Sequence, residues 1–360
     1  MKNWKSWFEE GSLKFLLFLI AWYFVCYVGT TVVPKCFTDP AIAGDNMVGQ
    51  IAYMVYNTIG GLTVVLLIVF GFGWLRHFKS TGSMTLCGIT FPREFIYLLP
   101  SGICTAVIIP GTTLMYSYRG IDVLAAVVFM RGAVIVIGWV VDFLQKQFKI
   151  SKKIVFWQEH IAVLFAIGAV ILMNAFKDSK GDNLLTSAGA TTTFVLYVLA
   201  YLIRIYIMNY WRNTREGSAG DNRGYFAVEQ IFSATTLVIA FPIILWLGAG
   251  DPRVEEMRVA IGNVNWSAVA SGAPFGLAAF ASVFLLMFKG RNATFSALAN
   301  RTTSLVAGLV GNIILWLHFG LEKDKPGTPE CLGLGLVLIA IVFLALAEYR
   351  RFLLKKSQPA

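Results

Sequence analysis

Long apolar runs separated by short polar loops form the main pattern of this chain. About 20 consecutive apolar residues are enough for a helix to cross the ~30 Å hydrocarbon core of a bilayer. Ten runs reach that length, approximately residues 13–33, 50–74, 95–118, 123–143, 157–176, 187–210, 225–248, 268–288, 293–319 and 331–352. No loop between them is much longer than about 20 residues, although residues 251–266 are expected to include a short surface helix. The pattern therefore predicts an all-α, polytopic membrane protein with ten transmembrane helices and no soluble domain.

Composition supports this class. Of the 360 residues, 57% are hydrophobic and 14% are charged, and the mean hydropathy is +0.68. A soluble domain carries about 25% charged residues, so the partner expected for this surface is the lipid bilayer. The net charge of +10 comes mostly from short loops. We therefore attribute it to membrane topology and expect no nucleic-acid partner.

The distribution of lysine and arginine predicts the orientation. The two termini and the loops after the second, fourth, sixth and eighth runs hold 19 of these residues, whereas the opposite loops hold 8. Basic loops face the cytoplasm, so both termini are predicted to be cytoplasmic, as an even number of spans also requires. The first run has no small-residue cleavage site and should be retained as a span. The short tails favour a bacterial inner (plasma) membrane.

A shift of 170 residues shows a weak internal repeat. It places the stretch SGICTAVIIPGTTLMYSYRG, from Ser101, on SGAPFGLAAFASVFLLMFKG, from Ser271, and then Arg131 on Arg301. Five runs separate the copies, and an odd number of crossings inverts the second copy relative to the first. We therefore predict two inverted five-helix repeats, residues 1–180 and 181–360, an arrangement typical of secondary transporters.

Arg131 and Arg301 lie within apolar runs, where a charge costs about 2.5–3.5 kcal/mol at the bilayer centre. Arg131 follows a polar turn at Asp122 by nine residues, and Arg301 follows one at Asn292 by the same number. Nine helical residues span roughly 13 Å, so the two arginines are expected at the same depth, measured from opposite faces of the membrane. Inverted-repeat transporters bind their substrates at this level. Both arginines are therefore candidates for binding an anionic group. The alternative is that each arginine bonds only to neighbouring helix carbonyls or a carboxylate and serves packing.

Further polar and aromatic residues inside the runs complete the predicted site. Substrate-binding candidates beside the arginines are Asn300, Thr302, Tyr116, Asn57 and Tyr197, although packing in the core is the usual role of a buried tyrosine. Arg204 and Glu229 lie at similar depths near one loop, and they are predicted to form a gate or coupling pair. Alternatively, Arg204 extends to the cytoplasmic interface, while Glu229 is paired or carries a proton.

Catalytic and metal-binding signals are missing from the sequence. The five cysteines and three histidines have no metal-ligand spacing, and no phosphate-binding loop motif is present. We expect no enzyme activity, catalytic residue, metal or cofactor.

Two short motifs resemble a known family. YRGIDVLAAVVFMRGAVIVIGWVV, with Met130, Arg131, Gly132 and Ala133, resembles the fourth-span region of the solute carrier 35 and chloroquine-resistance-transporter-like branches of the drug/metabolite transporter superfamily, which includes EamA-like proteins. FSALANRTTSLVAGLVGN resembles the ninth span of nucleotide-sugar-type members, with Thr302 in place of their second basic residue. The resemblance implies ten spans in two inverted halves and a basic residue that faces a small-molecule substrate.

Together these features predict a secondary transporter or exporter, monomeric or homodimeric, that moves a small organic metabolite with an anionic group by alternating access. Transport of zwitterionic or lipophilic metabolites or drugs is the alternative within the class. A non-transporting membrane scaffold or receptor is the alternative outside it. Transport requires a hydrated midplane cavity, whereas a scaffold predicts a dry core.

Overall fold

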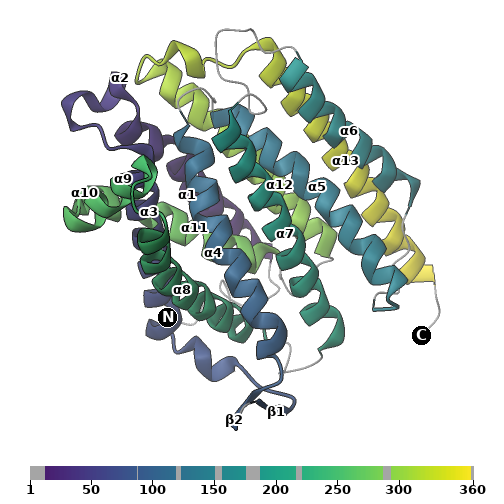
Figure 1. Cartoon of the computed structure of the whole chain (residues 1–360). Helices are drawn as coiled ribbons and strands as arrows, with labels where there is room; N and C mark the ends of the chain where they lie inside the picture. Colours follow the sequence, from purple (N-terminus) through teal and green to yellow (C-terminus); the bar gives the residue numbers. More distant parts are fainter. Residues whose placement is uncertain are drawn as a thin grey trace, which may run out of the picture.

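Helices make up nearly all of the described structure. The computed structural model describes residues 13–86, 88–118, 123–150, 156–175, 187–215, 221–286 and 293–357 (Figure 1). The long helices are α1 (Leu13–Thr38), α3 (Gln50–Gly71), α4 (Phe95–Ser117), α5 (Val123–Gln147), α6 (Trp157–Ala175), α7 (Ala188–Thr214), α8 (Asn222–Leu247), α11 (Ala273–Leu286), α12 (Ala293–Leu317) and α13 (Thr328–Ser357). The short ones are α2 (Pro40–Ala43), α9 (Pro252–Gly262), α10 (Trp266–Ala270) and the 3-10 turns Gly44–Asn46, Trp74–His77 and Glu322–Asp324.

Eight helices among the described residues are long and apolar enough to cross a membrane, with α10 and α11 counted as one. A shorter apolar helix, Trp157–Leu172, lies within α6. The chain is therefore an integral, multi-pass membrane protein of the all-α class. The count of ten spans and the inverted repeat stay predictions, and the turns at Asp122 and Asn292 lie outside the described residues.

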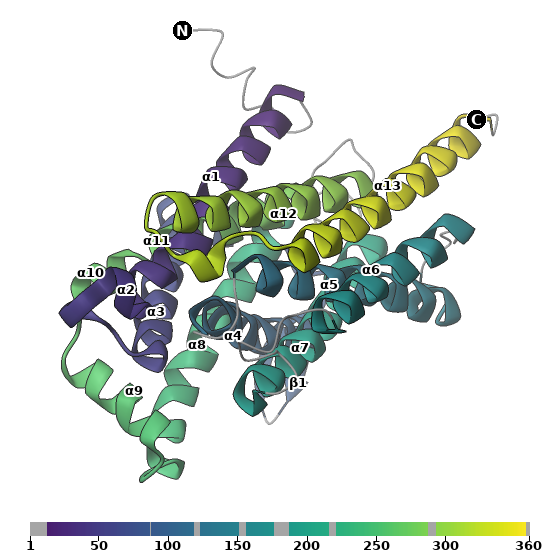
Figure 2. The same cartoon turned by 90° about the horizontal axis from the view of Figure 1, so that it is seen from above.

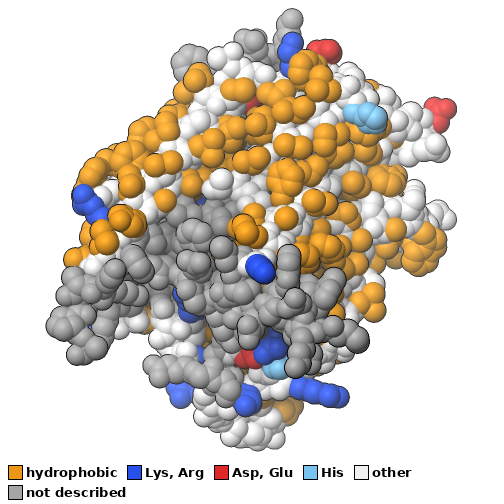
Figure 3. All heavy atoms as spheres, turned by 180° about the vertical axis from the view of Figure 1, so that it is seen from behind, with side chains coloured by type: hydrophobic (Ala, Val, Ile, Leu, Met, Phe, Trp, Pro, Cys, Tyr) orange, Lys and Arg blue, Asp and Glu red, His pale blue; other side chains and the backbone are white. Residues whose placement is uncertain are grey.

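The surface agrees with a lipid environment. Figure 3 shows hydrophobic side chains over much of one face, with Lys and Arg gathered at its lower edge. Several large apolar side chains on different helices have most of their surface exposed, including Leu67 (67%), Leu164 (68%) and Val238 (70%). A soluble monomer rarely exposes such continuous apolar surface, because it would drive association in water.

The loop before α4 differs from the all-helical prediction. Strands β1 (Ser83–Leu86) and β2 (Ile89–Pro92) pair as an antiparallel hairpin, with Ser83 opposite Pro92 and Leu86 opposite Ile89. The hairpin lies at the opposite end of the bundle from α2 (Figure 1). Gly88 has a φ of 80° in its turn, a conformation that glycine adopts without the steric penalty of a Cβ atom.

The surface helix α9, expected from the sequence, is hydrogen-bonded to α3 from its middle and from its C-terminal end. Glu256 of α9 accepts hydrogen bonds from the backbone amides of Ile51 (3.0 Å) and Ala52 (3.1 Å) in the first turn of α3. The Tyr56 hydroxyl lies 3.0 Å from the Ala260 carbonyl and 2.8 Å from the Asn263 carbonyl at the end of α9. A carboxylate at a helix N-terminus interacts favourably with the unpaired amides there. Figure 2 shows α9 projecting from the side of the bundle.

Candidate functional site

A cavity of about 70 Å³ lies among six helices. Residues of α1, α4, α5, α7, α8 and α11 form its wall. The polar ones are Tyr23, Tyr27, Thr30, Thr105, Thr112, Arg131, Tyr197, Tyr201, Arg204, Gln230 and Ser282. The apolar ones are Ile108, Ile109, Phe275, Ala278, Ala279 and Val283. Because it is polar and larger than a single water needs, such a cavity can hold several water molecules or a small polar group.

Arg131 of α5 is the central charge of this cavity and is 7% exposed. Its Nη2 donates hydrogen bonds to the hydroxyls of Tyr27 (2.7 Å) and Tyr23 (3.3 Å), and its guanidinium carbon lies 5.0 Å from the centre of the Tyr27 ring. Its Nε has no hydrogen-bond partner, and no carboxylate of the described residues forms an ion pair with it. A buried cation with a spare donor is suited to bind an oxyanion.

Tyrosines surround this guanidinium. The rings of Tyr23 and Tyr27, one helical turn apart on α1, are 5.4 Å apart, and those of Tyr197 and Tyr201 on α7 are 4.6 Å apart. Tyr197, one of the predicted binding residues, lines the cavity. Tyr116, another predicted binding residue, lies behind the wall and hydrogen-bonds to the Tyr27 hydroxyl. It therefore reaches Arg131 only through Tyr27.

Arg204 and Glu229 form a bidentate ion pair between α7 and α8. The Arg204 Nε lies 2.9 Å from Glu229 Oε1, and its Nη2 lies 2.8 Å from Oε2. Glu229 is fully buried and also accepts hydrogen bonds from Ser101 (2.6 Å) and Tyr225 (3.2 Å). The matched depths of the two charges predicted this contact. Arg204 also lines the cavity, so it does not extend to the membrane interface.

Arg301 of α12 contacts the backbone of α5, the helix that carries Arg131. Its Nη2 donates to the Val134 carbonyl at 3.3 Å and lies 3.1 Å from where a Cβ atom at Gly138 would be. Arg301 is not among the cavity-lining residues. The packing alternative, in which an arginine bonds to a helix carbonyl, therefore describes Arg301, and the predicted joint site of the two arginines is not formed in this structure.

The residues beside Arg301 differ in their relation to the cavity. Asn300 donates from Nδ2 to the Ser282 Oγ at 2.9 Å. Ser282 lines the cavity but Asn300 does not, so Asn300 is connected to the cavity through Ser282. Thr302 is half-buried and is not part of the wall.

Asn57 joins helices away from the cavity. Its Oδ1 accepts from the Thr113 hydroxyl (2.9 Å), and its Nδ2 donates to the Tyr53 hydroxyl (3.2 Å). Tyr53 in turn hydrogen-bonds to Ser271 (3.1 Å). This buried chain links α3 to α4 and to the segment after α10. Asn57, a predicted substrate-binding residue, is absent from the cavity wall in this structure.

Eight polar residues of the wall are not in the predicted site, and they are Tyr23, Tyr27, Thr30, Thr105, Thr112, Tyr201, Gln230 and Ser282. Gln230 directly follows Glu229, and Ser282 lies within an otherwise apolar stretch of α11. Tyr27 follows Tyr23 by four residues, a spacing that puts both on one helix face. That spacing, together with Arg131, was the available signal for the aromatic side of the cavity.

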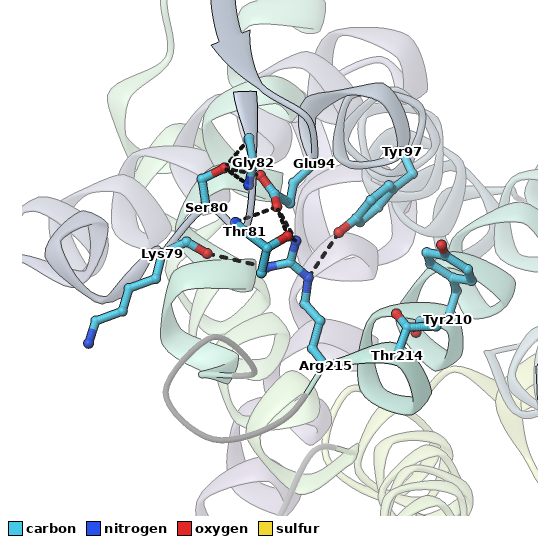
Figure 4. A network of polar contacts seen from close by, with 9 residues as sticks. All are labelled: Lys79, Ser80, Thr81, Gly82, Glu94, Tyr97, Tyr210, Thr214 and Arg215. Carbon is cyan, nitrogen blue, oxygen red and sulfur yellow. Dashed lines mark hydrogen bonds and ion pairs between the residues drawn. The ribbon is translucent and has the colours of Figure 1, made fainter. Parts of the chain in front are cut away.

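A second polar cluster holds the hairpin end of the bundle together (Figure 4). Glu94, just before α4, accepts hydrogen bonds from the Ser80 hydroxyl (2.6 Å) and the Thr81 amide (2.9 Å), and it forms an ion pair with Arg215 after α7. Arg215 also donates to the Tyr97 hydroxyl at 3.1 Å. Burial alone would raise the pKa of Glu94, but the hydrogen bonds from Ser80 and Thr81 outweigh it and lower the pKa to about 2.

Among the described residues, no three His, Cys, Asp or Glu side chains group as a metal site requires.

Comparisons with known proteins bear on the fold alone. No protein-family model matches the sequence, and no curated protein matches it significantly. One crystal structure of a protein superposes on 94% of this chain and 99% of its own chain, with a TM-score of 0.53 and 12% sequence identity. The architecture therefore has a counterpart among solved structures over nearly its whole length.

Proposed function

We propose that this chain is a secondary transporter of a small organic solute, whose anionic group binds to Arg131 in the cavity between α1, α4, α5, α7, α8 and α11. The proposal includes ten spans in two inverted halves, cytoplasmic termini and a bacterial inner membrane. The lysine and arginine distribution supports the cytoplasmic termini, and the 170-residue repeat and the likeness of the Met130–Ala133 motif to drug/metabolite transporters support the ten spans in two halves.

One observation carries the proposal: Arg131 is buried in a polar cavity without a carboxylate partner among the described residues. A buried guanidinium costs free energy, and replacing buried charges with apolar side chains is often neutral or stabilising. A scaffold that binds no ligand has no use for such a residue. A transporter does, since an unpaired cation in a hydrated cavity can exchange one anionic ligand after another.

The experiment compares Arg131→Lys with Arg131→Leu. Lysine keeps the charge but cannot form two parallel hydrogen bonds to one oxyanion. We expect Arg131→Lys to insert normally and to weaken binding of small organic acids about 10- to 150-fold, corresponding to about 1.5–3 kcal/mol. Arg131→Leu removes the buried charge, so the protein should stay as stable as wild type or become more stable, while uptake into proteoliposomes is lost.

The control is Arg258→Leu, because Arg258 is an exposed arginine on α9. It should leave uptake unchanged.

Two results would contradict the proposal. One is that Arg131→Leu aggregates while Arg131→Lys transports at the wild-type rate. The other is that no organic acid, zwitterion or lipophilic amine in a screen either stabilises the wild-type protein or crosses proteoliposomes faster than protein-free vesicles. The second result would favour a scaffold or receptor.

A further inference from the structure

The charges around the cavity can be counted, because only two side chains of its described wall carry one. They are Arg131 of α5 and Arg204 of α7, and a guanidinium stays protonated in proteins. Arg131 donates to the hydroxyls of Tyr27 and Tyr23, and among the described residues no carboxylate forms an ion pair with it. The described protein therefore does not offset the charge of Arg131.

The charge of Arg204, in contrast, is offset by Glu229 of α8. The two side chains make two contacts, at 2.9 Å and 2.8 Å, and Glu229 itself is not in the wall. Arg301, which is also outside the wall, interacts electrostatically with Asp142 of α5, so these two opposite charges add nothing to the count. The cavity is left with one uncompensated positive charge.

Glu229 is also closed to any cationic group of a solute. It is fully buried, and its Oε1 accepts from Arg204, from Ser101 at 2.6 Å and from Tyr225 at 3.2 Å, while its Oε2 accepts from Arg204. An ammonium group in the cavity would therefore find no carboxylate in the described wall. It would instead be repelled by two guanidinium groups, and such repulsion is strong where water is largely excluded.

We infer that the cavity selects solutes by net charge, so that the preferred substrates are compact organic monoanions, and zwitterions and dianions bind less tightly. The inference rests on the proposed function of Arg131. A monoanion neutralises the one uncompensated cation. A zwitterion leaves the net charge unchanged, and the second charge of a dianion has only Arg204, which Glu229 already holds. Both therefore leave a buried charge without a counter-charge, which is costly.

The experiment uses four three-carbon probes that differ in charge, because a cavity of about 70 Å³ is about half the volume of one that binds benzene. Lactate is a monoanion, alanine a zwitterion, lactamide neutral and malonate, at pH 8, a dianion. Their dissociation constants are measured by calorimetry on the purified full-length protein. Wild type should bind lactate about 10- to 100-fold more tightly than each of the other three.

Ser282→Asp and Ser282→Asn are a matched pair of variants. Ser282 lines the cavity, and the two new side chains have nearly the same size but differ by one negative charge. Ser282→Asn should rank the probes as wild type does. Ser282→Asp should raise the affinity for alanine relative to lactate about 10-fold or more, because the added carboxylate attracts the ammonium group and repels a second anion.

Glu229→Gln changes the count in the other direction. It leaves the charge of Arg204 without its carboxylate, so the cavity has two uncompensated positive charges. Malonate should then bind more tightly relative to lactate than it does in wild type, about 10-fold or more. This variant is on a different helix from Ser282, so it tests the inference independently if Ser282→Asp does not fold.

The outcomes separate the two proposals. If wild type binds malonate or alanine as tightly as lactate, the selection by charge is refuted, while the anion site at Arg131 stands. The same holds if Ser282→Asp ranks the probes as Ser282→Asn does, or if Glu229→Gln keeps the wild-type ratio of malonate to lactate. If wild type binds none of the probes, or Arg131→Leu binds lactate as tightly as wild type, the proposed function itself fails.

Discussion

The charged residues inside the helices differ in how each is compensated. Arg204 has a bidentate carboxylate, Arg301 has a helix carbonyl, and Arg131 has two tyrosine hydroxyls and the face of a tyrosine ring. Coulombic pairing lowers the cost of burial most, whereas hydroxyls and carbonyls carry only partial charges. Of the three, Arg131 alone lines the cavity without a carboxylate partner among the described residues.

The Arg204–Glu229 pair gives a prediction about stability. Glu229→Gln leaves the guanidinium of Arg204 without its counter-charge in a buried position, and removing one partner of a buried pair costs about 3–5 kcal/mol. We expect a corresponding loss in the free energy of unfolding in detergent, and impaired uptake. The double variant Arg204→Gln/Glu229→Gln should recover part of the stability but not the uptake.

The same variants test the gate or coupling role of the pair. Uptake into proteoliposomes should be measured from pH 5 to pH 8. Wild-type uptake by Glu229→Gln over this whole range would mean that the pair is neither a gate nor part of proton coupling. A double variant less stable than the single variant would contradict the burial argument.

At this scale the sequence indicated which residues were buried, but it predicted only some of their contacts. Depth follows from the distance along a helix to a polar turn, so the contact between Arg204 and Glu229 was predictable. The direction of a long side chain depends on which neighbouring helix lies beside it. Arg301 therefore contacts Val134 of α5, where sequence reasoning placed it in the substrate site.

Between elements, the cluster around Glu94 connects the segment before α4 to the hairpin loop and to the end of α7 (Figure 4). The pKa of Glu94 falls from its ordinary 4.5 to about 2 in the folded protein. A carboxyl group with a lowered pKa adds stability above its unfolded pKa, and this contribution is lost as the pH falls from about 4.5 towards 2.

We therefore expect Glu94→Gln to be less stable than wild type at pH 7, and the difference to shrink as the pH is lowered below 4.5. Melting temperatures between pH 7 and pH 3 would measure this. Glu255→Gln is the control, because the Glu255 side chain on α9 is 45% exposed and, among the described residues, forms an ion pair with the neighbouring Arg258 alone. It should change the melting temperature little at any pH. A difference between Glu94→Gln and wild type that stays constant down to pH 3 would contradict the prediction.

Close contact between α3 and the α10–α11 segment depends on glycine. A Cβ atom at Gly60 would lie 1.8 Å from the Val269 carbonyl oxygen, and one at Gly272 would lie 2.4 Å from the Asn57 carbonyl oxygen. Both clashes are with backbone, which cannot move aside as a side chain can. Small residues at helix interfaces in membranes permit such close approach.

Gly60→Ala should therefore force the two segments apart and destabilise the protein by more than about 1–3 kcal/mol, the usual cost of overpacking. Gly168→Ala on α6 is the matched control, since nothing lies within 4 Å of a Cβ atom there. It should be neutral or stabilising by up to about 1 kcal/mol, because alanine favours helix. Equal melting temperatures for the two variants would show that the glycine contact is not tight.

Hydropathy predicted the positions of the helices along the chain more closely than it predicted the residues at which they begin and end. The predicted run 50–74 appears as α3 and ends at Gly71, and a 3-10 turn follows it. The run 268–288 is divided into α10 and α11 around Ser271 and Gly272, just before Pro274, which cannot donate a backbone hydrogen bond. The hairpin was not predictable, because two four-residue strands leave too weak a pattern in a polar loop.

Over the whole molecule, the sequence predicted the class of the fold and the existence of a polar cavity, but not the cavity's wall. Apolar length alone determines how many helices can cross the bilayer. The cavity, in contrast, is formed by six helices from both halves of the chain. Which faces meet there depends on packing between distant segments, such as the contact of Gly60 with Val269, and periodicity along one chain does not contain that information.

The number of crossings is the last feature to test, and α6 is the helix that decides it in the first half. Its described apolar part, Trp157–Leu172, is shorter than those of the eight candidate spans. If α6 crosses the membrane, Lys149 and Ser187, which lie before and after it, are on opposite sides. The basic loops predict that Lys149 is cytoplasmic.

Single cysteines at Lys149 and Ser187, in a background without the five native cysteines, would show this in intact cells. A membrane-impermeant thiol reagent should label Ser187→Cys from outside, and it should label Lys149→Cys only after the membrane is opened. Cysteine at Asp45, in the loop that precedes α3 on the predicted outer side, is the positive control. Labelling of both test positions from the same side would mean that α6 does not cross. The second half of the chain would then no longer be inverted relative to the first, and the repeat that pairs Arg131 with Arg301 would lose its structural meaning.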